Sequence, residues 1–259
     1  MLINKEEIIA KWNAEMYDQH VTEVDDVDFI LSLIGTDVKR VLEVACGSGR
    51  ILVPLAKAGH DVVGMDIDQS MLDKLTDKAM HVNNIAYHRS DVINDPWGSG
   101  FDVVLLAANF LFNIVSDTDD QLAQKRVIHK SAQALVSGGH VFIDLAYTQH
   151  PQKWFDDPQD NVIWQGTDSN GTYGSMLLKD STFDTEKNVC HFTRVIQLKL
   201  KDGKEIVHKT RSTKHFITLK QLHEWLTRYG FVIKKEYGDY QGNPISDTTN
   251  RAIIWAQKE

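Results

Sequence analysis

The sequence predicts an α/β protein in which a doubly wound, mainly parallel sheet of seven strands is interrupted by an inserted antiparallel β segment. Three observations support this fold class. Apolar runs alternate with helical patterns over residues 38–145, a glycine turn follows the first of these runs, and the apolar period changes from helical to two between about residues 161 and 217. Continuous apolar strands separated by helices are typical of a parallel sheet that is covered on both faces.

Two helices are predicted ahead of the first strand. In the first segment apolar side chains recur at helical spacing, which indicates an amphipathic helix that stops near Asp18. A second helix is expected over residues 24–34, where Gly35 ends it. The apolar positions of the first helix are Ile8, Ile9, Trp12, Met16 and Tyr17.

The parallel part of the sheet is expected to come from five strands. A helix follows the glycine turn, but Pro54 lies about one turn into it and cannot donate a backbone hydrogen bond, so that helix starts late or bends there. Either Asp68 or Ser70 caps the next helix, and Gly138-Gly139 breaks the helix that precedes the fifth strand. The expected strands are 38–44, 62–66, 85–88, 101–108 and 141–145, and the later helices are 70–80 and 119–135.

The antiparallel insert precedes one more helix and a closing strand pair. Its alternating segments are 175–183, 189–200 and 205–216, joined by turn signals such as Asp202-Gly203. Thr218 then caps a helix through Tyr229, and strands follow at 231–237 and 251–256. The expected division is a core of residues 1–147 and 218–259, which includes the N-terminal helices, and an insert of residues 148–217.

The glycine turn and an acid one strand later indicate a site for a nucleoside-containing cofactor. The turn at Gly47 exposes backbone N–H groups where a ligand can approach closely, and Asp66 ends the second strand 19 residues later. That spacing places a carboxylate across from a glycine loop in a β-turn-α-β unit. A dinucleotide site needs Gly-x-Gly-x-x-Gly, but the third position is Leu52 counted from Gly47, or Arg50 counted from Ala45.

The pattern Glu43-x-Ala45-x-Gly47-x-Gly49 instead resembles motif I of the class I S-adenosylmethionine-dependent methyltransferases, which is usually acidic-x-Gly-x-Gly-x-Gly. The order of elements also resembles the small-molecule branch of that family, in which an inserted β sheet forms a lid over the substrate. The resemblance implies a Rossmann-like core, S-adenosylmethionine as cofactor and methyl transfer. Ala45 stands where the pattern has its first glycine, so we expect a negative φ there.

The resemblance assigns the cofactor contacts to residues that follow the strands. Asp66 would accept the ribose hydroxyls, with the alternative that it caps a helix. Asp91 would accept from the adenine amino group, with the alternative of an exposed turn acid. The adenine would also contact Ile67, Met71 and the backbone of Val92, although both apolar side chains fit a core role equally well.

The methionine end of the cofactor would lie at the glycine turn and the fourth strand. Ala45 and Gly47 would leave room for it, Glu43 would approach its ammonium group or satisfy backbone donors, and the Ala107 carbonyl would accept from that ammonium. Tyr17, in a Tyr-Asp pair, would reach the cofactor carboxylate or the nucleophile, or simply end a helix half buried.

Asn113 is a weak candidate for orienting the substrate. Some amino-sugar N-methyltransferases of similar layout have His where this chain has Ile114, and none of the eleven histidines is singled out as a base. The acceptor, its N or O nucleophile and the oligomeric state stay open.

Composition favours a small-molecule acceptor. The net charge is −8, from 28 basic and 36 acidic residues, and the longest basic run is Lys234-Lys235, so neither nucleic acid nor an acidic lipid surface is an expected partner. Cys46 and Cys190 form no Cys-x-x-Cys pair, which argues against zinc and a disulfide framework. Without a stretch of 18 apolar residues, a cytoplasmic protein is expected. Two alternatives are a non-catalytic nucleoside-binding regulatory protein and, with less support, a nicotinamide-dependent oxidoreductase.

Overall fold

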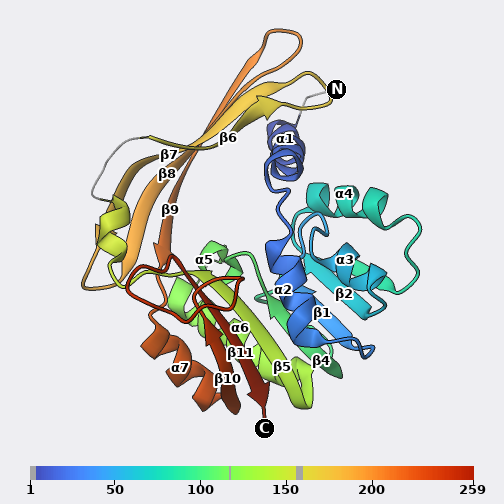
Figure 1. Cartoon of the computed structure of the whole chain (residues 1–259). Helices are drawn as coiled ribbons and strands as arrows, with labels where there is room; N and C mark the ends of the chain where they lie inside the picture. The colour runs from blue at the N-terminus through green and yellow to red at the C-terminus, as the bar shows by residue number, and fades with distance from the viewer. Residues whose placement is uncertain (1–3, 117, 156–159) are drawn as a thin grey trace. The chain divides into compact units, whose positions relative to one another are not determined.

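A computed structural model describes residues 4–116, 118–155 and 160–259 (Figure 1). Within these residues the chain forms two compact units. One comprises Val24–Gln149 and Ile217–Glu259, and the other comprises the chain before Val24 together with His150–Phe216. We call the first the core unit and the second the insert unit.

A seven-stranded sheet forms the centre of the core unit, which confirms the predicted fold class. Its order is β10-β11-β5-β4-β1-β2-β3, and only β11 runs against the other strands, because it pairs antiparallel with both β5 and β10. The strands are β1 (Arg40–Val44), β2 (Asp61–Asp66), β3 (Ile85–Arg89), β4 (Phe101–Leu106), β5 (Leu135–Ala146), β10 (Phe231–Tyr237) and β11 (Arg251–Lys258).

Helices cover both faces of this sheet, as continuous apolar strands require. One face packs against α2 (Asp25–Ile34), α3 (Leu52–Lys57) and α4 (Gln69–Ala79). The other packs against α5 (Phe110–Asn113), α6 (Asp120–Ala134) and α7 (Leu219–Arg228). Gly35 ends α2 with a φ of 81°, and Thr218 forms a capping box with Gln221 at the start of α7.

The structure tests two local expectations, the start of the helix after the glycine turn and the break before the fifth strand. The helix after the glycine turn starts late, at Leu52, so that Pro54 lies in its first turn, where a missing N–H costs least. The expectation of a break at Gly138-Gly139 is wrong, because β5 already begins at Leu135. Gly138 instead takes a φ of 79° inside the strand, close to the register shift between β4 and β5.

The insert unit contains an antiparallel sheet in the order β6-β7-β8-β9. Its strands are β6 (Asn161–Thr167), β7 (Tyr173–Asp184), β8 (Val189–Lys199) and β9 (Glu205–His215), and a short 3-10 helix, η1 (Pro151–Phe155), precedes them. The turn signals of the sequence lie between these strands, as predicted. Among the described residues no helix is long and apolar enough to cross a membrane.

The first helix, α1 (Lys5–His20), packs on this antiparallel sheet (Figure 1). Its Trp12 and Met16 are fully buried, and a Cβ added at Gly174 or Gly166 would come within 2.9 Å of Trp12 or 2.8 Å of Met16. The two glycines therefore admit the helix. This grouping differs from the expected division, which placed both N-terminal helices with the core; periodicity identifies an apolar helix face but not the surface that covers it.

We predict that Trp12→Ala destabilises the insert unit by about 3–5 kcal/mol, because it removes a fully buried indole together with its hydrogen bond to the Gly166 carbonyl. Limited proteolysis should then cleave within residues 160–216 while fragments of the core unit persist. Trp12→Phe, which keeps most of the buried area, is the matched control. Equal protease resistance of wild type and Trp12→Ala would contradict this packing role.

Candidate active site

The carboxyl end of β1 leads into a turn with an unusual backbone. Ala45, Gly47 and Gly49 have φ values of 58°, 54° and 78°, so the expectation of a negative φ at Ala45 is wrong. A left-handed conformation costs an alanine about 1–2 kcal/mol. The turn is fixed on both sides, since Cys46 N donates to the Met65 carbonyl at 3.0 Å and Gly49 N donates to the Cys46 carbonyl at 2.9 Å. Such strain persists where the surroundings over-determine it, which is common at ligand sites.

The two glycines of the turn have different surroundings. A Cβ at Gly49 would lie 2.3 Å from Leu75 Cδ1, so Gly49 is needed for α4 to pack against the turn. A Cβ at Gly47 would meet no described atom within 4 Å. Gly47 thus presents its backbone to open space, as a turn that admits a ligand requires.

Asp66 joins the ends of β1 and β2. Its Oδ2 accepts from Gly47 N at 2.8 Å and its Oδ1 from Asp68 N at 2.8 Å, while only 8% of the residue is exposed. Burial raises the pKa of Asp66, and the two backbone donors oppose that shift. Asp68 caps α4 by accepting from Ser70 N, so Asp66 is not the helix cap. Each Asp66 oxygen keeps a lone pair that could accept from a ribose hydroxyl.

The predicted adenine contacts follow β2 and β3. Ile67 is 57% exposed beside Asp66, and Met71 is half-buried on α4. Asp91 caps the turn after β3, because its oxygens accept from the Ile93 and Asn94 amides. Burial acts to raise the pKa of Asp91, but these hydrogen bonds hold it below its usual value.

Val92 is buried, and its carbonyl accepts from Trp97 Nε1 at 2.8 Å and from Lys130 Nζ at 2.7 Å. The cofactor contacts assigned to Asp66, Ile67, Met71, Asp91 and Val92 stay predictions.

Glu43, at the carboxyl end of β1, is a buried acid with an incomplete set of partners. Only 4% of it is exposed, and its carboxylate accepts from the Leu52 backbone N–H, yet its Oε2 has no hydrogen-bond donor among the described residues. Burial raises the pKa of Glu43 well above its usual value, and the positive charge of Arg50 only partly opposes this. A buried carboxylate oxygen of this kind fits a cationic ligand group.

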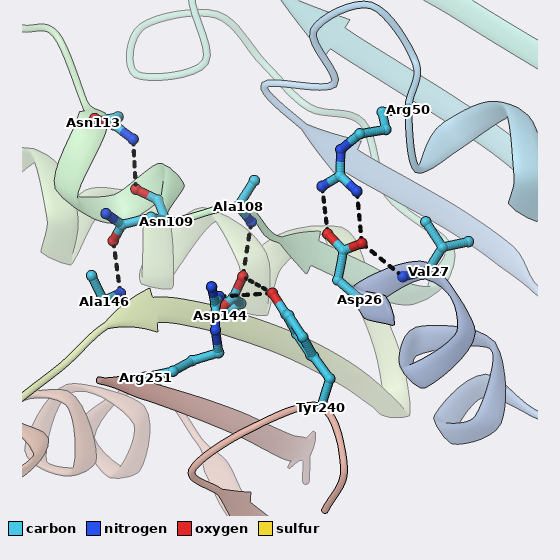
Figure 2. A network of polar contacts seen from close by, with 10 residues as sticks. All are labelled: Asp26, Val27, Arg50, Ala108, Asn109, Asn113, Asp144, Ala146, Tyr240 and Arg251. Carbon is cyan, nitrogen blue, oxygen red and sulfur yellow. Dashed lines mark hydrogen bonds and ion pairs between the residues drawn. The ribbon is translucent and has the colours of Figure 1, made fainter. Parts of the chain in front are cut away.

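Arg50 directly follows the glycine turn and pairs with Asp26 on α2 (Figure 2). Its Nη1 donates to Asp26 Oδ1 at 2.7 Å, and its Nη2 donates to Asp26 Oδ2. Asp26 is buried, and its charge raises the pKa of Glu43. Sequence reasoning missed this pair; the signal that could have found it is an arginine placed directly after the glycine turn.

The end of β4 holds a second strained turn. Ala108 and Asn109 have φ values of 51° and 58°, and both are bound to β5. Ala108 N donates to Asp144 Oδ2 at 3.2 Å, and Asn109 Oδ1 accepts from Ala146 N at 3.0 Å (Figure 2). The preceding Ala107 is buried, and its carbonyl accepts from Phe110 N at 3.0 Å, which leaves one lone pair for a cofactor ammonium.

Asp144 anchors this turn from the centre of a network that the sequence analysis also missed. It is fully buried, accepts from Tyr240 Oη at 2.8 Å, and forms an ion pair with Arg251. Burial raises the pKa of Asp144, opposed by Arg251 and by the Tyr240 hydrogen bond. The exposed Asn113 donates from Nδ2 to the Asn109 carbonyl at 3.2 Å, so the candidate for orienting the substrate contacts the same turn (Figure 2).

Tyr17 belongs to the insert unit and stands edge-on to Trp164, with ring centroids 6.2 Å apart and planes at 88°. Its proposed contact with the cofactor or the nucleophile stays a prediction. The remaining candidates gather in the core unit, at the carboxyl ends of β1 to β4, where ligands bind in open α/β sheets.

A family model described as a methyltransferase domain matches residues 41–139, the segment that carries this edge of the sheet. Residues 41–139 are a class I, S-adenosylmethionine-dependent methyltransferase domain. This agrees with the cofactor and the enzyme class that the resemblance implies, and not with a nicotinamide-dependent oxidoreductase.

Similar proteins match this chain over different shares of its length. A protein of Geobacillus sp. (strain WCH70), whose name assigns it to the methyltransferases, is 25% identical over 222 residues, 85% of each chain. A 23S rRNA uracil methyltransferase of Aeromonas salmonicida is 29% identical over 128 residues, but these cover 41% of this chain and 28% of the relative.

A solved structure shares the fold of the whole chain. It is an amino pentose methyltransferase from Micromonospora echinaspora, involved in calicheamicin biosynthesis, with S-adenosylmethionine bound. The TM-score is 0.64 at 15% identity, and the match covers 100% of this chain and 98% of that one.

We predict that Asp66→Ala weakens binding of S-adenosylhomocysteine at least tenfold. Two hydrogen bonds from ribose to a carboxylate are lost, each contributing about 1.5–3 kcal/mol, while tenfold corresponds to about 1.4 kcal/mol. Isothermal titration calorimetry measures the change. Because Asp66 also accepts from Gly47 N, circular dichroism must first show a folded variant. Unchanged affinity in a folded variant would rule out the ribose contact.

We also predict that Glu43→Gln changes how stability depends on pH. The folded-state pKa of Glu43 is raised, so its contribution to stability is present at low pH and is lost as pH rises from its usual value near 4.5 through the folded value. A neutral glutamine escapes that loss, so the thermal midpoint of the variant, relative to that of wild type, should rise as the pH is raised above 4.5. A difference independent of pH would contradict a buried, uncompensated carboxylate.

Proposed function

We propose that this protein transfers the methyl group of S-adenosylmethionine to an amino group of a small molecule. The main observation that supports the proposed orientation of the cofactor is the buried Glu43 Oε2, which has no hydrogen-bond donor among the described residues. The ammonium of the cofactor would supply that donor, and the Ala107 carbonyl would accept from it as well. The ribose would lie at Asp66, on the other side of the open Gly47 backbone.

The chain's part in the reaction is to align the reactants. S-adenosylmethionine supplies a methyl group already activated by its sulfonium, so the nucleophile needs correct orientation and exclusion of water more than a strong base. The strained turns at Ala45 and Ala108 would hold the backbone against the cofactor, and Asp144 holds the second turn in place. Asn113, bound to that turn, would orient the acceptor.

An amine is favoured over a hydroxyl for two reasons. A neutral amine carries a nucleophilic lone pair and attacks without a base, whereas a hydroxyl must be deprotonated, and Asp66, Asp91 and Asp144 already accept hydrogen bonds from the protein. In addition, one solved structure whose match covers the whole chain is an amino pentose methyltransferase. Ile114 remains a departure from some enzymes of that kind, so the amine need not belong to a sugar.

The insert unit supports a small acceptor. Residues 148–217 are proposed to act as a lid that excludes water from the acceptor, and Tyr17 would act from the same unit. Small-molecule sites are concave and bury most of their ligand, and a built-in cover is one way to reach that burial. The rRNA methyltransferase relative shares only a partial segment with this chain.

The test is methyl transfer from radiolabelled S-adenosylmethionine to a set of primary amines and their matched alcohols. We expect turnover with amines and loss of turnover in Asp66→Ala. Turnover confined to alcohols would overturn the amine assignment, and labelling of ribosomal RNA alone would overturn the small-acceptor assignment.

A binding prediction addresses the macromolecular alternative. With a net charge of −8 and no basic run longer than two residues, the chain should not shift tRNA or duplex DNA in a gel at about 50 mM salt, where electrostatic affinity is near its strongest. Tight binding that weakens steeply as salt is raised would contradict the prediction without affecting the cofactor assignment.

A further inference from the structure

Lys130 of α6 binds the loop that follows β3 through three backbone carbonyls. We call this loop, residues 90–97, the β3 loop. The ammonium donates to the carbonyls of Val92 at 2.7 Å, Ile93 at 3.2 Å and Asp95 at 2.5 Å. An ammonium group has three donors, so one side chain from a distant helix uses all of them on a single loop.

Trp97 contacts the same ammonium from within the β3 loop. The indole is buried, and the Lys130 Nζ lies 5.0 Å from its ring centroid, a distance at which a cation is attracted to the ring. Trp97 Nε1 also donates to the Val92 carbonyl at 2.8 Å. Burial lowers the pKa of Lys130, and the charges of Asp91 and Asp95 oppose that shift. The loop therefore compensates the cation that holds it.

The backbone amides of the β3 loop are used inside the loop with one exception. Asp91 N donates to Asp95 Oδ2 at 2.8 Å, and Ile93 N donates to Asp91 Oδ1 at 2.9 Å. The Asp91 carbonyl accepts from Asn94 N at 3.1 Å and from Asp95 N at 2.8 Å. Val92 N is the exception, because it donates to no atom in the part of the chain that the structure describes.

The direction of the Val92 N–H follows from peptide geometry. The peptide between Asp91 and Val92 is trans, so its C=O and N–H point in opposite directions. Since two amides of the turn bind the Asp91 carbonyl, the Val92 N–H points out of the turn. Asp91 Oδ2 accepts from Asn94 Nδ2 at 2.7 Å and keeps a lone pair. One donor and one acceptor on consecutive residues thus remain for a ligand.

We propose that Lys130 is a positioning residue that gives the cofactor site its preference for adenine. By holding three carbonyls of the β3 loop, it keeps the Val92 N–H and the Asp91 carboxylate in the arrangement that the base requires. The proposal rests on the proposed function and on the predicted adenine contacts of these two residues.

Adenine matches this donor and acceptor, whereas hypoxanthine does not. The adenine amino group would donate to the Asp91 carboxylate, and its N1 would accept from the Val92 N–H. Hypoxanthine has a carbonyl in place of the amino group and a hydrogen on N1, so an acceptor would face the carboxylate and a donor would face the N–H. A site with polar groups left unpaired in this way rejects the wrong ligand strongly.

Two attachments hold the β3 loop on the core unit. Ser90 N donates to the Asp66 carbonyl at 2.8 Å, so the beginning of the loop is bound to the residue predicted to hold the ribose. Lys130 binds the remainder of the loop to α6. Without the ammonium the turn would keep its internal hydrogen bonds but not its place relative to Asp66. Binding groups must be held within about 0.5 Å of the productive geometry, so a displaced loop would discriminate poorly between bases.

The test compares the affinities of the full chain for S-adenosylhomocysteine and S-inosylhomocysteine, in which hypoxanthine replaces adenine, by isothermal titration calorimetry. The variants are Lys130→Met and the milder Lys130→Gln, which keeps two N–H donors; circular dichroism shows whether each is folded. Lys125→Met is the matched control on the same helix. Lys125 donates to Gln121 of α6 and lies 5.4 Å from the Trp225 ring centroid on α7, away from the β3 loop.

We expect wild type and Lys125→Met to prefer S-adenosylhomocysteine by more than about tenfold. The preference should fall below roughly threefold in Lys130→Met and take an intermediate value in Lys130→Gln. A purely structural role would weaken both ligands equally and leave their ratio unchanged, which would overturn the proposal.

Three other results would also contradict the role of Lys130. These are equal binding of the two ligands by wild type, loss of the preference in Lys125→Met, and, if Lys130→Met does not fold, a full preference in Lys130→Gln. Failure of wild type to bind S-adenosylhomocysteine at all would instead count against the proposed function.

Discussion

The hydrogen bond from Gly47 N to the Asp66 carboxylate is the constraint on which the candidate site depends. It connects the turn after β1 to the last residue of β2, and the carboxylate that accepts it belongs to a residue that is only 8% exposed. With the Cys46 N bond to the Met65 carbonyl, it sets the position of the strained turn relative to the neighbouring strand. One carboxylate therefore holds the turn in place and is also the group that we propose as the ribose acceptor.

The same arrangement recurs at the end of β4 with a different anchor. Ala108 and Asn109 take left-handed backbone conformations that Asp144 and Ala146 of β5 hold in place (Figure 2). Asp144 is itself compensated by Arg251 and Tyr240, so its charge is tolerated in a buried position. Hydrogen bonds from neighbouring strands thus hold the strained backbone, and ion pairing to a neighbouring strand compensates the buried charge. The sheet supplies the rigidity that alignment of two reactants requires.

The elements of the core unit were largely predictable, because local patterns specify them. Apolar runs located the strands, the glycine spacing located the turn, and Asp68 caps α4 as its sequence position indicates. Contacts between distant residues were not predictable: Asp144 is 96 residues from Tyr240 and 107 from Arg251, and no local pattern relates them. The positive φ of Ala45 escaped prediction because an alanine gives no local sign of a conformation that tertiary hydrogen bonds impose.

The packing of α1 on the insert sheet has a consequence for synthesis of the chain. Trp12 and the Gly166 carbonyl that it contacts are 154 residues apart, so the helix leaves the ribosome long before its sheet exists. At about 5–20 residues per second, the delay is roughly 8–30 s. During that interval the tryptophan face of α1 lacks the sheet that covers it, so the insert unit is completed by a long-range docking step after the sheet has been synthesised.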